Sequence, residues 1–223
     1  MKAGLAAAAL VMGLGACSPA ASSVPEGALR YVALGDSYTI GTSISAAESW
    51  PSQLVARLPA LQLVANLGVN GHTSADLIDD ELPALAGLRP QFVRLMIGAN
   101  DVVQGVPEQV YRTNVEEIID AMLASVAADR ALCIATPDYT ATPQGGAFGS
   151  PEQQRAGIER VNVLLGEACA ARGIRFVPEI FEISQAAASD RSLVARDGLH
   201  PSGAQYSMWV DAIQPVVEDL LGE

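Results

Sequence analysis

The sequence predicts an α/β protein in which one parallel sheet is covered by helices on both faces. From residue 30 onward, short apolar runs alternate with longer segments of helical periodicity, as is typical of this class. The short runs are apolar at consecutive positions, which is expected of strands buried on both faces. A chain of 223 residues is long enough for one domain with a sizeable core. We therefore expect one α/β domain over residues 29–223.

The apolar runs are the expected strands, and three longer segments are the clearest helices. The strands are expected at residues 30–34, 61–65, 92–97, 131–136 and 174–177. The helices are expected around residues 111–126, 158–169 and 202–221, where apolar residues recur at three- and four-residue spacing. Pro215 lies inside the last of these segments and is expected to kink it.

The first residues have the pattern of an export signal. Lys2 precedes an apolar stretch at residues 5–14 that has signal-peptide length and is too short to span a membrane. The stretch ends in Leu-Gly-Ala-Cys, which resembles the bacterial lipobox, so we expect residues 1–16 to be removed and Cys17 to carry lipid. Residues 17–28 would then be a flexible tether. The alternative is an ordinary secretory signal that is cleaved after an alanine near position 16 or 20.

The amino-acid composition limits which partners the protein can bind and which catalytic chemistry it can use. The formal net charge of −12, without a Lys/Arg cluster, disfavours nucleic acid and anionic lipid as partners and fits a neutral or cationic small substrate. The lipid on Cys17 is then the expected membrane contact of an exported lipoprotein that faces the periplasm or the cell exterior. Lys2 is the only lysine of the chain, so lysine-based catalysis is excluded from the mature protein. The sequence does not indicate an oligomeric state.

Small polar turns follow the first three expected strands. The first strand runs into Asp36-Ser37, the second into residues 66–73 and the third into residues 98–101. Because the carboxyl ends of parallel strands meet at one edge of a sheet, these turns are expected to converge there. We interpret Ser37 as a nucleophile held at that edge. Taken alone, its Gly-Asp-Ser segment is better explained as an ordinary polar turn, and the residues described below favour the nucleophile.

Only two histidines are available as a general base for this serine. His200 lies in Asp-Gly-Leu-His-Pro, where Gly198 permits a bend that brings the Asp197 carboxylate near the imidazole. Capping of the last helix would explain Asp197 and Pro201 but not the histidine. We expect His72 at the edge of the pocket, since no carboxylate lies at short spacing from it.

Acyl transfer at a serine also requires donors for the oxyanion. Gly71 offers a backbone N–H without a side chain in the way, Asn100 offers its side-chain amide, and the Ser37 N–H would be the third donor. Each has a structural alternative, which is a turn with positive φ for Gly71 and a cap of the following segment for Asn100.

Four segments of the chain resemble the four sequence blocks of the SGNH, or GDSL-type, hydrolases, in the order of that family. They are Gly-Asp-Ser-Tyr at 35–38, residues 66–73, Gly-Ala-Asn-Asp at 98–101, and Asp-Gly-Leu-His-Pro at 197–201. Tyr38 stands where the family's nickname has a leucine. The resemblance implies a three-layer α/β/α sandwich with a five-stranded parallel sheet of flavodoxin-like strand order. It also implies Ser37 as nucleophile, Gly71 and Asn100 as oxyanion donors, and Asp197 and His200 as acid and base.

The expected activity is therefore ester hydrolysis through an acyl-enzyme on Ser37, with small or lipid-like substrates of the esterase, lysophospholipase or thioesterase type. A carbohydrate O-acetyl esterase is the alternative, and a non-catalytic binding lipoprotein is a further one. No cofactor and no metal are expected. The acidic run at residues 79–81 is interpreted as a solvated helix face.

Two features leave alternatives open. Residues 137–150 are longer than a strand-to-helix connection needs, and they either shape the substrate pocket or form a disordered surface excursion. Cys133 and Cys169 fall in a buried strand and on the apolar side of a helix, so core packing is expected. A disulfide between them is the alternative for an exported protein.

Overall fold

The structure is a computed structural model that describes residues 27–222. The predicted signal peptide at residues 1–16, the lipidation site Cys17 and most of the predicted tether lie outside the described residues.

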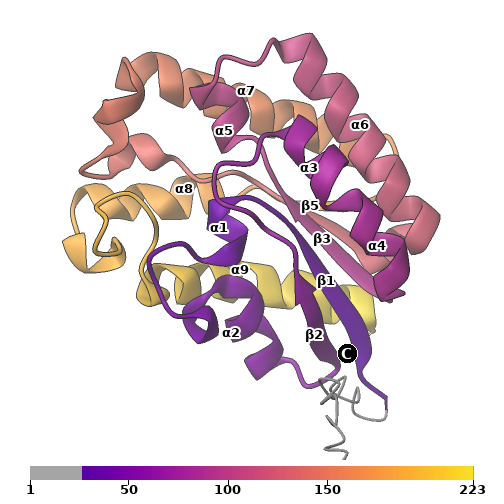
Figure 1. Cartoon of the computed structure of the whole chain (residues 1–223). Helices are drawn as coiled ribbons and strands as arrows, with labels where there is room; N and C mark the ends of the chain where they lie inside the picture. Colours follow the sequence, from indigo (N-terminus) through magenta and orange to yellow (C-terminus); the bar gives the residue numbers. More distant parts are fainter. Residues whose placement is uncertain (1–26, 223) are drawn as a thin grey trace, which may run out of the picture.

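Five parallel strands form one sheet with the order β2-β1-β3-β4-β5, and Figure 1 labels β2, β1, β3 and β5 in it. The strands are β1 (Leu29–Gly35), β2 (Leu61–Asn66), β3 (Phe92–Met96), β4 (Ala131–Ile134) and β5 (Arg175–Val177). All five expected strands are present, and the flavodoxin-like order is confirmed. The main difference is β4, which ends at Ile134, two residues before the predicted end.

Helices cover both faces of the sheet (Figure 1). The α-helices are α1 (Ser37–Ile40), α2 (Trp50–Arg57), α3 (Ser74–Asp80), α4 (Leu82–Leu88), α5 (Ala99–Val103), α6 (Glu108–Ser125), α7 (Pro151–Ala170), α8 (Ile180–Ser184) and α9 (Gly203–Leu221). The short 3-10 helices are η1 (Ala46–Glu48), η2 (Ala128–Arg130), η3 (Tyr139–Ala141), η4 (Gly145–Phe148), η5 (Gln185–Ala188) and η6 (Arg191–Leu193). The three predicted long helices correspond to α6, α7 and α9, and α9 continues through Pro215.

Two hydrophobic clusters fill the space between the sheet and its helices. One packs α2 and α9 against the sheet through Trp50, Trp209 and Ile213. The other packs α3, α4, α6 and α7 against the opposite face, with Val115 and Leu165 among its buried members. The described chain is therefore the expected three-layer α/β/α sandwich.

A disulfide between Cys133 of β4 and Cys169 of α7 joins the sheet to the second cluster. The expectation of two packed thiols was therefore wrong. Burial of both residues was correctly anticipated, but their Cα–Cα distance of 6.9 Å depends on how α7 lies on the sheet, which a sequence does not give.

No helix within residues 27–222 combines the length and the apolar composition that crossing a membrane requires.

Candidate active site

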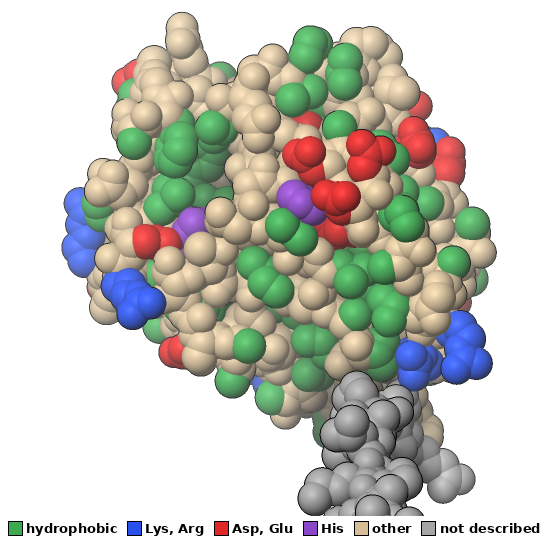
Figure 2. Space-filling model, in the orientation of Figure 1, with side chains coloured by type: hydrophobic (Ala, Val, Ile, Leu, Met, Phe, Trp, Pro, Cys, Tyr) green, Lys and Arg blue, Asp and Glu red, His purple; other side chains and the backbone are tan. Residues whose placement is uncertain are grey.

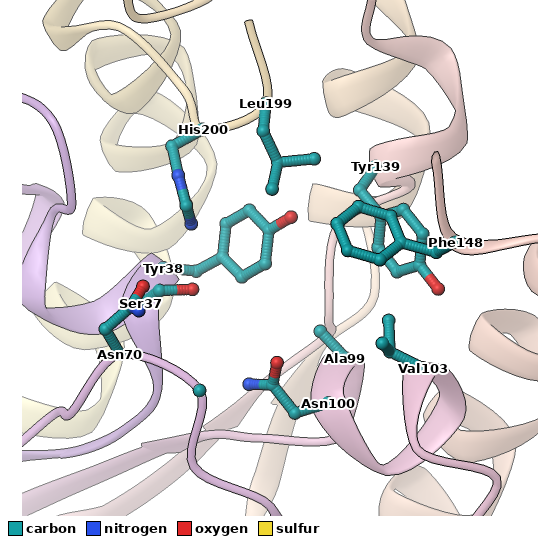
Figure 3. A pocket seen from close by; sticks show the side chains of 11 residues that line it. Ser37, Tyr38, Asn70, Ala99, Asn100, Val103, Tyr139, Phe148, Leu199 and His200 are labelled. Carbon is teal, nitrogen blue, oxygen red and sulfur yellow. The ribbon is translucent and has the colours of Figure 1, made fainter. Parts of the chain in front are cut away.

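A pocket of about 220 Å³ lies at the carboxyl edge of the sheet, and Figure 3 shows the side chains around it. It contains four of the sequence-predicted site residues, contributed by three strand ends and the loop before α9. The lining residues are Ser37, Tyr38, Asn70, Gly71, Ala99, Asn100, Val103, Tyr139, Phe148, Leu199 and His200. The expected convergence of the polar turns is confirmed.

A sharp turn between β1 and α1 places Ser37 in this pocket. Gly35 has φ +148°, and a Cβ at this residue would lie 2.2 Å from the carbonyl oxygen of Met96, so only glycine fits. Asp36 caps α1 by accepting a hydrogen bond from the Tyr38 N–H at 2.9 Å. Ser37 is the first residue of the helix, and its side chain points into the pocket (Figure 3).

His200 and Asp197 lie in one loop before α9, as the sequence predicted. The His200 Nδ1 and the Asp197 Oδ2 are 2.6 Å apart, and Gly198 takes φ +75° at the bend between them. The ring of His200 is directed towards Ser37 (Figure 3). Among the described residues 27–222, no hydrogen bond joins the side chains of Ser37 and His200, although both line the same pocket.

Ser43 is a site residue that the sequence did not reveal. Its hydroxyl donates a hydrogen bond to Oδ2 of Asp197 at 2.6 Å, while Oδ1 accepts from the backbone N–H groups of Leu199 and His200 at 2.9 and 3.0 Å. Partial burial acts to raise the pKa of Asp197. The hydrogen bonds from Ser43, the His200 ring and the two N–H groups outweigh it and hold that pKa well below its usual range. Asp197 is therefore a carboxylate, able to orient His200.

Three N–H donors surround the space beside Ser37. The backbone N–H groups of Ser37 and Gly71 have no acceptor among the described residues. The Asn100 amide donates to the carbonyl oxygen of His72 at 2.9 Å, which fixes its orientation and leaves its second hydrogen free. Gly71 has φ +89°, and a Cβ there would meet no protein atom within 4 Å, so glycine is required by backbone conformation and not by crowding.

The opposite wall of the pocket is apolar and comes partly from the long loop at residues 137–150. Tyr139 and Phe148 pack edge-to-face with ring centroids 5.6 Å apart, and both line the pocket. Hydrophobic side chains gather in a hollow beside one of the two histidines (Figure 2). The pocket-shaping interpretation of this loop is therefore supported, and the interpretation as a surface excursion is wrong. The two aromatic residues of the loop were a signal that sequence analysis could have used.

The same loop is tied to the loop that carries His200. The Gln144 N–H donates a hydrogen bond to the carbonyl oxygen of Gly198 at 3.0 Å. At the start of the loop, the Asp138 N–H donates to the Ser184 hydroxyl of α8 at 2.8 Å. The apolar wall is thus attached both to the general-base loop and to the body of the protein.

His72 is not among the residues that line the pocket, so the expectation that it lies at the pocket edge was wrong. Its Nδ1 is 3.1 Å from Oε1 of Glu81, and its Nε2 is 3.5 Å from Asp80. Figure 2 shows acidic side chains gathered beside one of the two histidines on this face of the molecule. The carboxylate partner of His72 comes nine residues later in the chain, a spacing that the sequence analysis did not consider.

The prediction that the acidic run at residues 79–81 is a solvated helix face was wrong for Glu81. Asp79 and Asp80 are exposed, but Glu81 is buried and its Oε2 accepts a hydrogen bond from the Gly35 N–H at 3.0 Å. Burial, reinforced by the carboxylates of Asp36 and Asp80, raises the pKa of Glu81 to about 9. Glu81 therefore connects the nucleophile turn to His72.

Residues 27–222 contain no group of three or more His, Cys, Asp or Glu side chains arranged to hold a metal ion.

Comparisons with known proteins agree with this geometry. The model of the GDSL-like Lipase/Acylhydrolase family matches residues 33–208, which is more than half of the chain. An arylesterase from Vibrio mimicus is 33% identical over 108 residues, or 46% of this chain and 52% of the relative. That match spans about half the length of the relative.

Solved structures share the fold at low sequence identity. A lipase/acylhydrolase from Enterococcus faecalis matches with a TM-score of 0.68 and 20% identity, over 86% of this chain and 96% of the other. An acetylxylan esterase from Geobacillus stearothermophilus matches with a TM-score of 0.67 and 18% identity, over 86% of this chain and 95% of the other. Together with the family match, these findings show that the chain belongs to the GDSL-like lipase/acylhydrolase family, whose members are hydrolases that act on ester bonds.

Proposed function

We propose that this protein is a serine esterase that hydrolyses small or lipid-like carboxylic esters through an acyl-enzyme on Ser37. The observation that carries the proposal is the directed His200–Asp197 pair, which faces Ser37 across a pocket lined by three oxyanion donors. Nucleophile, base, orienting acid and oxyanion donors are the groups that acyl transfer at a serine requires.

The proposed mechanism assigns one task to each group. His200, oriented by Asp197, accepts the proton of the Ser37 hydroxyl as the serine oxygen attacks the ester carbonyl. The N–H groups of Ser37, Gly71 and Asn100 stabilise the negative charge of the tetrahedral intermediate. His200 then protonates the departing alcohol, and a water molecule that His200 activates hydrolyses the acyl-enzyme.

The pocket favours a short or medium acyl group or a small aromatic one. Its volume of about 220 Å³ is below the ~300–1,000 Å³ of sites that hold drug-sized ligands. Its far wall is apolar, with Val103, Phe148 and Leu199 among the lining residues. The arylesterase from Vibrio mimicus is consistent with an ester of this kind. The second candidate is a carbohydrate O-acetyl esterase, because an acetylxylan esterase shares the fold.

Hydrolysis of p-nitrophenyl acetate, butyrate and decanoate by wild type and Ser37→Ala tests the proposal. We expect wild type to hydrolyse acetate and butyrate faster than decanoate, and Ser37→Ala to lose turnover of all three with an unchanged melting temperature. Turnover by Ser37→Ala equal to wild type would contradict the proposal. Strict preference for acetate, together with release of acetate from an acetylated polysaccharide, would favour the carbohydrate esterase.

We also propose that the protein is exported and anchored by lipid on Cys17. The support is the Leu-Gly-Ala-Cys sequence that follows an apolar stretch. Expression of the full chain in a bacterium that processes lipoproteins, followed by fractionation, tests this. Wild type should be in the membrane fraction and Cys17→Ser in the soluble exported fraction. An identical distribution of the two would overturn the anchor.

A further inference from the structure

Ser43 contacts the acid of the site from a segment far away in sequence. The two residues are 154 positions apart, and the Ser43 hydroxyl lies 2.6 Å from Oδ2 of Asp197. The same oxygen lies 2.6 Å from Nδ1 of His200, so it accepts from the serine and the histidine at once. Among residues 27–222, Asp197 is the hydrogen-bond partner of the Ser43 side chain.

The residue that makes this contact has a strained backbone. Ser43 has φ +69°, a left-handed conformation that glycine adopts freely and that serine adopts at a cost. Arg89, at the C-terminus of α4, is the other non-glycine residue with positive φ in the described chain. Strained residues persist where the surrounding structure requires them, and they cluster at functional sites. At Ser43 the side chain gives a reason, since glycine would relieve the strain but would lack the hydroxyl.

The hydrogen bonds leave the Asp197 carboxylate little freedom to rotate. Oδ1 is held by the backbone N–H groups of Leu199 and His200, which fix one end of the group. The Ser43 hydroxyl donates to one lone pair of Oδ2, and the remaining lone pair of that oxygen accepts from the His200 imidazole. Rotation of the carboxylate away from His200 would break the bond to Ser43, a hydrogen bond to a charged group and therefore among the stronger ones.

We propose that Ser43 is a positioning residue that holds the Asp197 carboxylate in register with His200. It lies six positions after Ser37, in the segment that leaves α1, and so connects the nucleophile segment to the acid at the other end of the chain. The inference rests on the proposed esterase function, because its purpose is to orient the general base. Ser43 itself does not touch the reacting atoms.

Two variants separate the hydroxyl from the backbone strain. Ser43→Ala removes the hydroxyl and keeps the strain, whereas Ser43→Gly removes both. We expect kcat for p-nitrophenyl acetate to fall roughly tenfold in both variants with KM nearly unchanged, which corresponds to loss of one hydrogen bond to a charged group. The melting temperature of Ser43→Gly should be higher than that of Ser43→Ala, because both lose the hydrogen bond and glycine alone relieves the positive φ. Wild-type kcat in Ser43→Gly would overturn the proposal.

Arg89→Gly is the matched control, because it relieves positive φ at an exposed residue remote from the pocket. It should raise or preserve the melting temperature and leave kcat unchanged. A second comparison uses Asp197→Ala as the background. If Ser43 acts through the carboxylate, Ser43→Gly causes no further loss of activity there. A loss by the same factor in both backgrounds would show that Ser43 acts elsewhere and would overturn the proposal.

A measurement without turnover separates this inference from the esterase proposal. The Nδ1 proton of a histidine in a short hydrogen bond to a carboxylate resonates far downfield in the proton NMR spectrum. We expect this signal in wild type and Arg89→Gly, and we expect Ser43→Gly to shift or broaden it. An unchanged signal in Ser43→Gly would overturn the positioning role. Failure of Ser37-dependent turnover with a Ser43-dependent signal would overturn the esterase proposal alone.

Discussion

Gly35 and Gly71 both serve the active site, but different physical reasons require them. At Gly35 the carbonyl oxygen of Met96 and the hydroxyl of Thr39 leave no room for a Cβ, so this glycine permits the turn that presents Ser37. At Gly71 the surrounding space is open and only the positive φ requires glycine. The first residue is therefore needed for folding and the second for the direction of an N–H group.

The side chain of Asn100 provides the corresponding test at the oxyanion site. Asn100→Ala should lower kcat by a factor of about 10² to 10³, the loss seen when one oxyanion donor is removed from a serine hydrolase. The fold should survive because the side chain makes one hydrogen bond, to the His72 carbonyl. Steady-state kinetics and circular dichroism check both expectations. Gln104→Ala is the control, since this exposed amide contacts the Gly71 carbonyl and should leave kcat near wild type.

The chemistry-bearing residues were predictable from sequence, whereas their supporting contacts were not. The scarcity of bases directed attention to His200, and the strand-end turns indicated Ser37 and Asn100. Ser43 carried no such signal, because its contact with Asp197 depends on the path of a loop that returns across 154 residues. Glu81 was misjudged because two exposed acids precede it in the same run.

At the scale of elements, the sheet was more predictable than the loops. Strands buried on both faces are apolar at consecutive positions, and this pattern predicted all five strands of the sheet. The loop at residues 137–150 folds into η3 and η4 and brings Tyr139 and Phe148 over the pocket. Such packing is a tertiary property, so the sequence indicated only that the loop was unusually long.

This loop is expected to control which acyl groups fit. Phe148→Ala should enlarge the pocket and shift preference towards longer chains, so that the ratio of kcat/KM for decanoate over acetate rises by about 5- to 10-fold, the effect of a few methylene contacts. Kinetics on the p-nitrophenyl ester series measure the ratio. Val110→Ala, which truncates an exposed residue of α6, should leave it unchanged. An unaltered ratio in Phe148→Ala would remove this loop from substrate selection.

The disulfide between β4 and α7 is expected to contribute to stability and not to catalysis. It closes a segment of 36 residues, for which the entropy lost by the unfolded chain gives about 2–4 kcal/mol. Cys133→Ala/Cys169→Ala should lower the free energy of unfolding by roughly this amount in urea titrations, with kcat near wild type. If the double variant is as stable as wild type whose disulfide has been kept oxidised, the disulfide does not contribute to stability.

At the scale of the whole molecule, stability is expected to depend on pH through its acidic side chains. The buried acids Asp36 and Glu81 act in the direction opposite to that of Asp197. Burial raises the pKa of Asp36 to about 7 and that of Glu81 to about 9. The folded chain therefore holds protons that the unfolded chain releases above about pH 4, so stability falls as pH rises through this range. Asp197, whose pKa is lowered, contributes stability above about pH 4 that is lost under stronger acid. The most stable pH is thus expected to be near 4.

Glu81→Gln tests this dependence. Glutamine keeps an acceptor for the Gly35 N–H but cannot ionise, so the variant should be more stable than wild type at pH 9 by about 1–2 kcal/mol and should lose less stability between pH 5 and pH 9. Thermal unfolding across pH measures it. Asp79→Asn, an exposed acid of the same run, should leave the slope unchanged. A wild-type slope in Glu81→Gln would contradict the assignment.

Net charge is also a property of the whole molecule that affects its stability. The chain carries a formal charge of −12, so salt should stabilise it by screening repulsion among its acids.

The central claim is that His200, from the far end of the chain, activates Ser37 for acylation. Mass spectrometry of the protein quenched during turnover of p-nitrophenyl butyrate tests it most directly. We predict one butyryl group on the peptide that contains Ser37 in wild type, none in Ser37→Ala, and acylation slowed by several orders of magnitude in His200→Ala. A butyryl group on another residue, or acylation of Ser37 at the wild-type rate in His200→Ala, would contradict the claim.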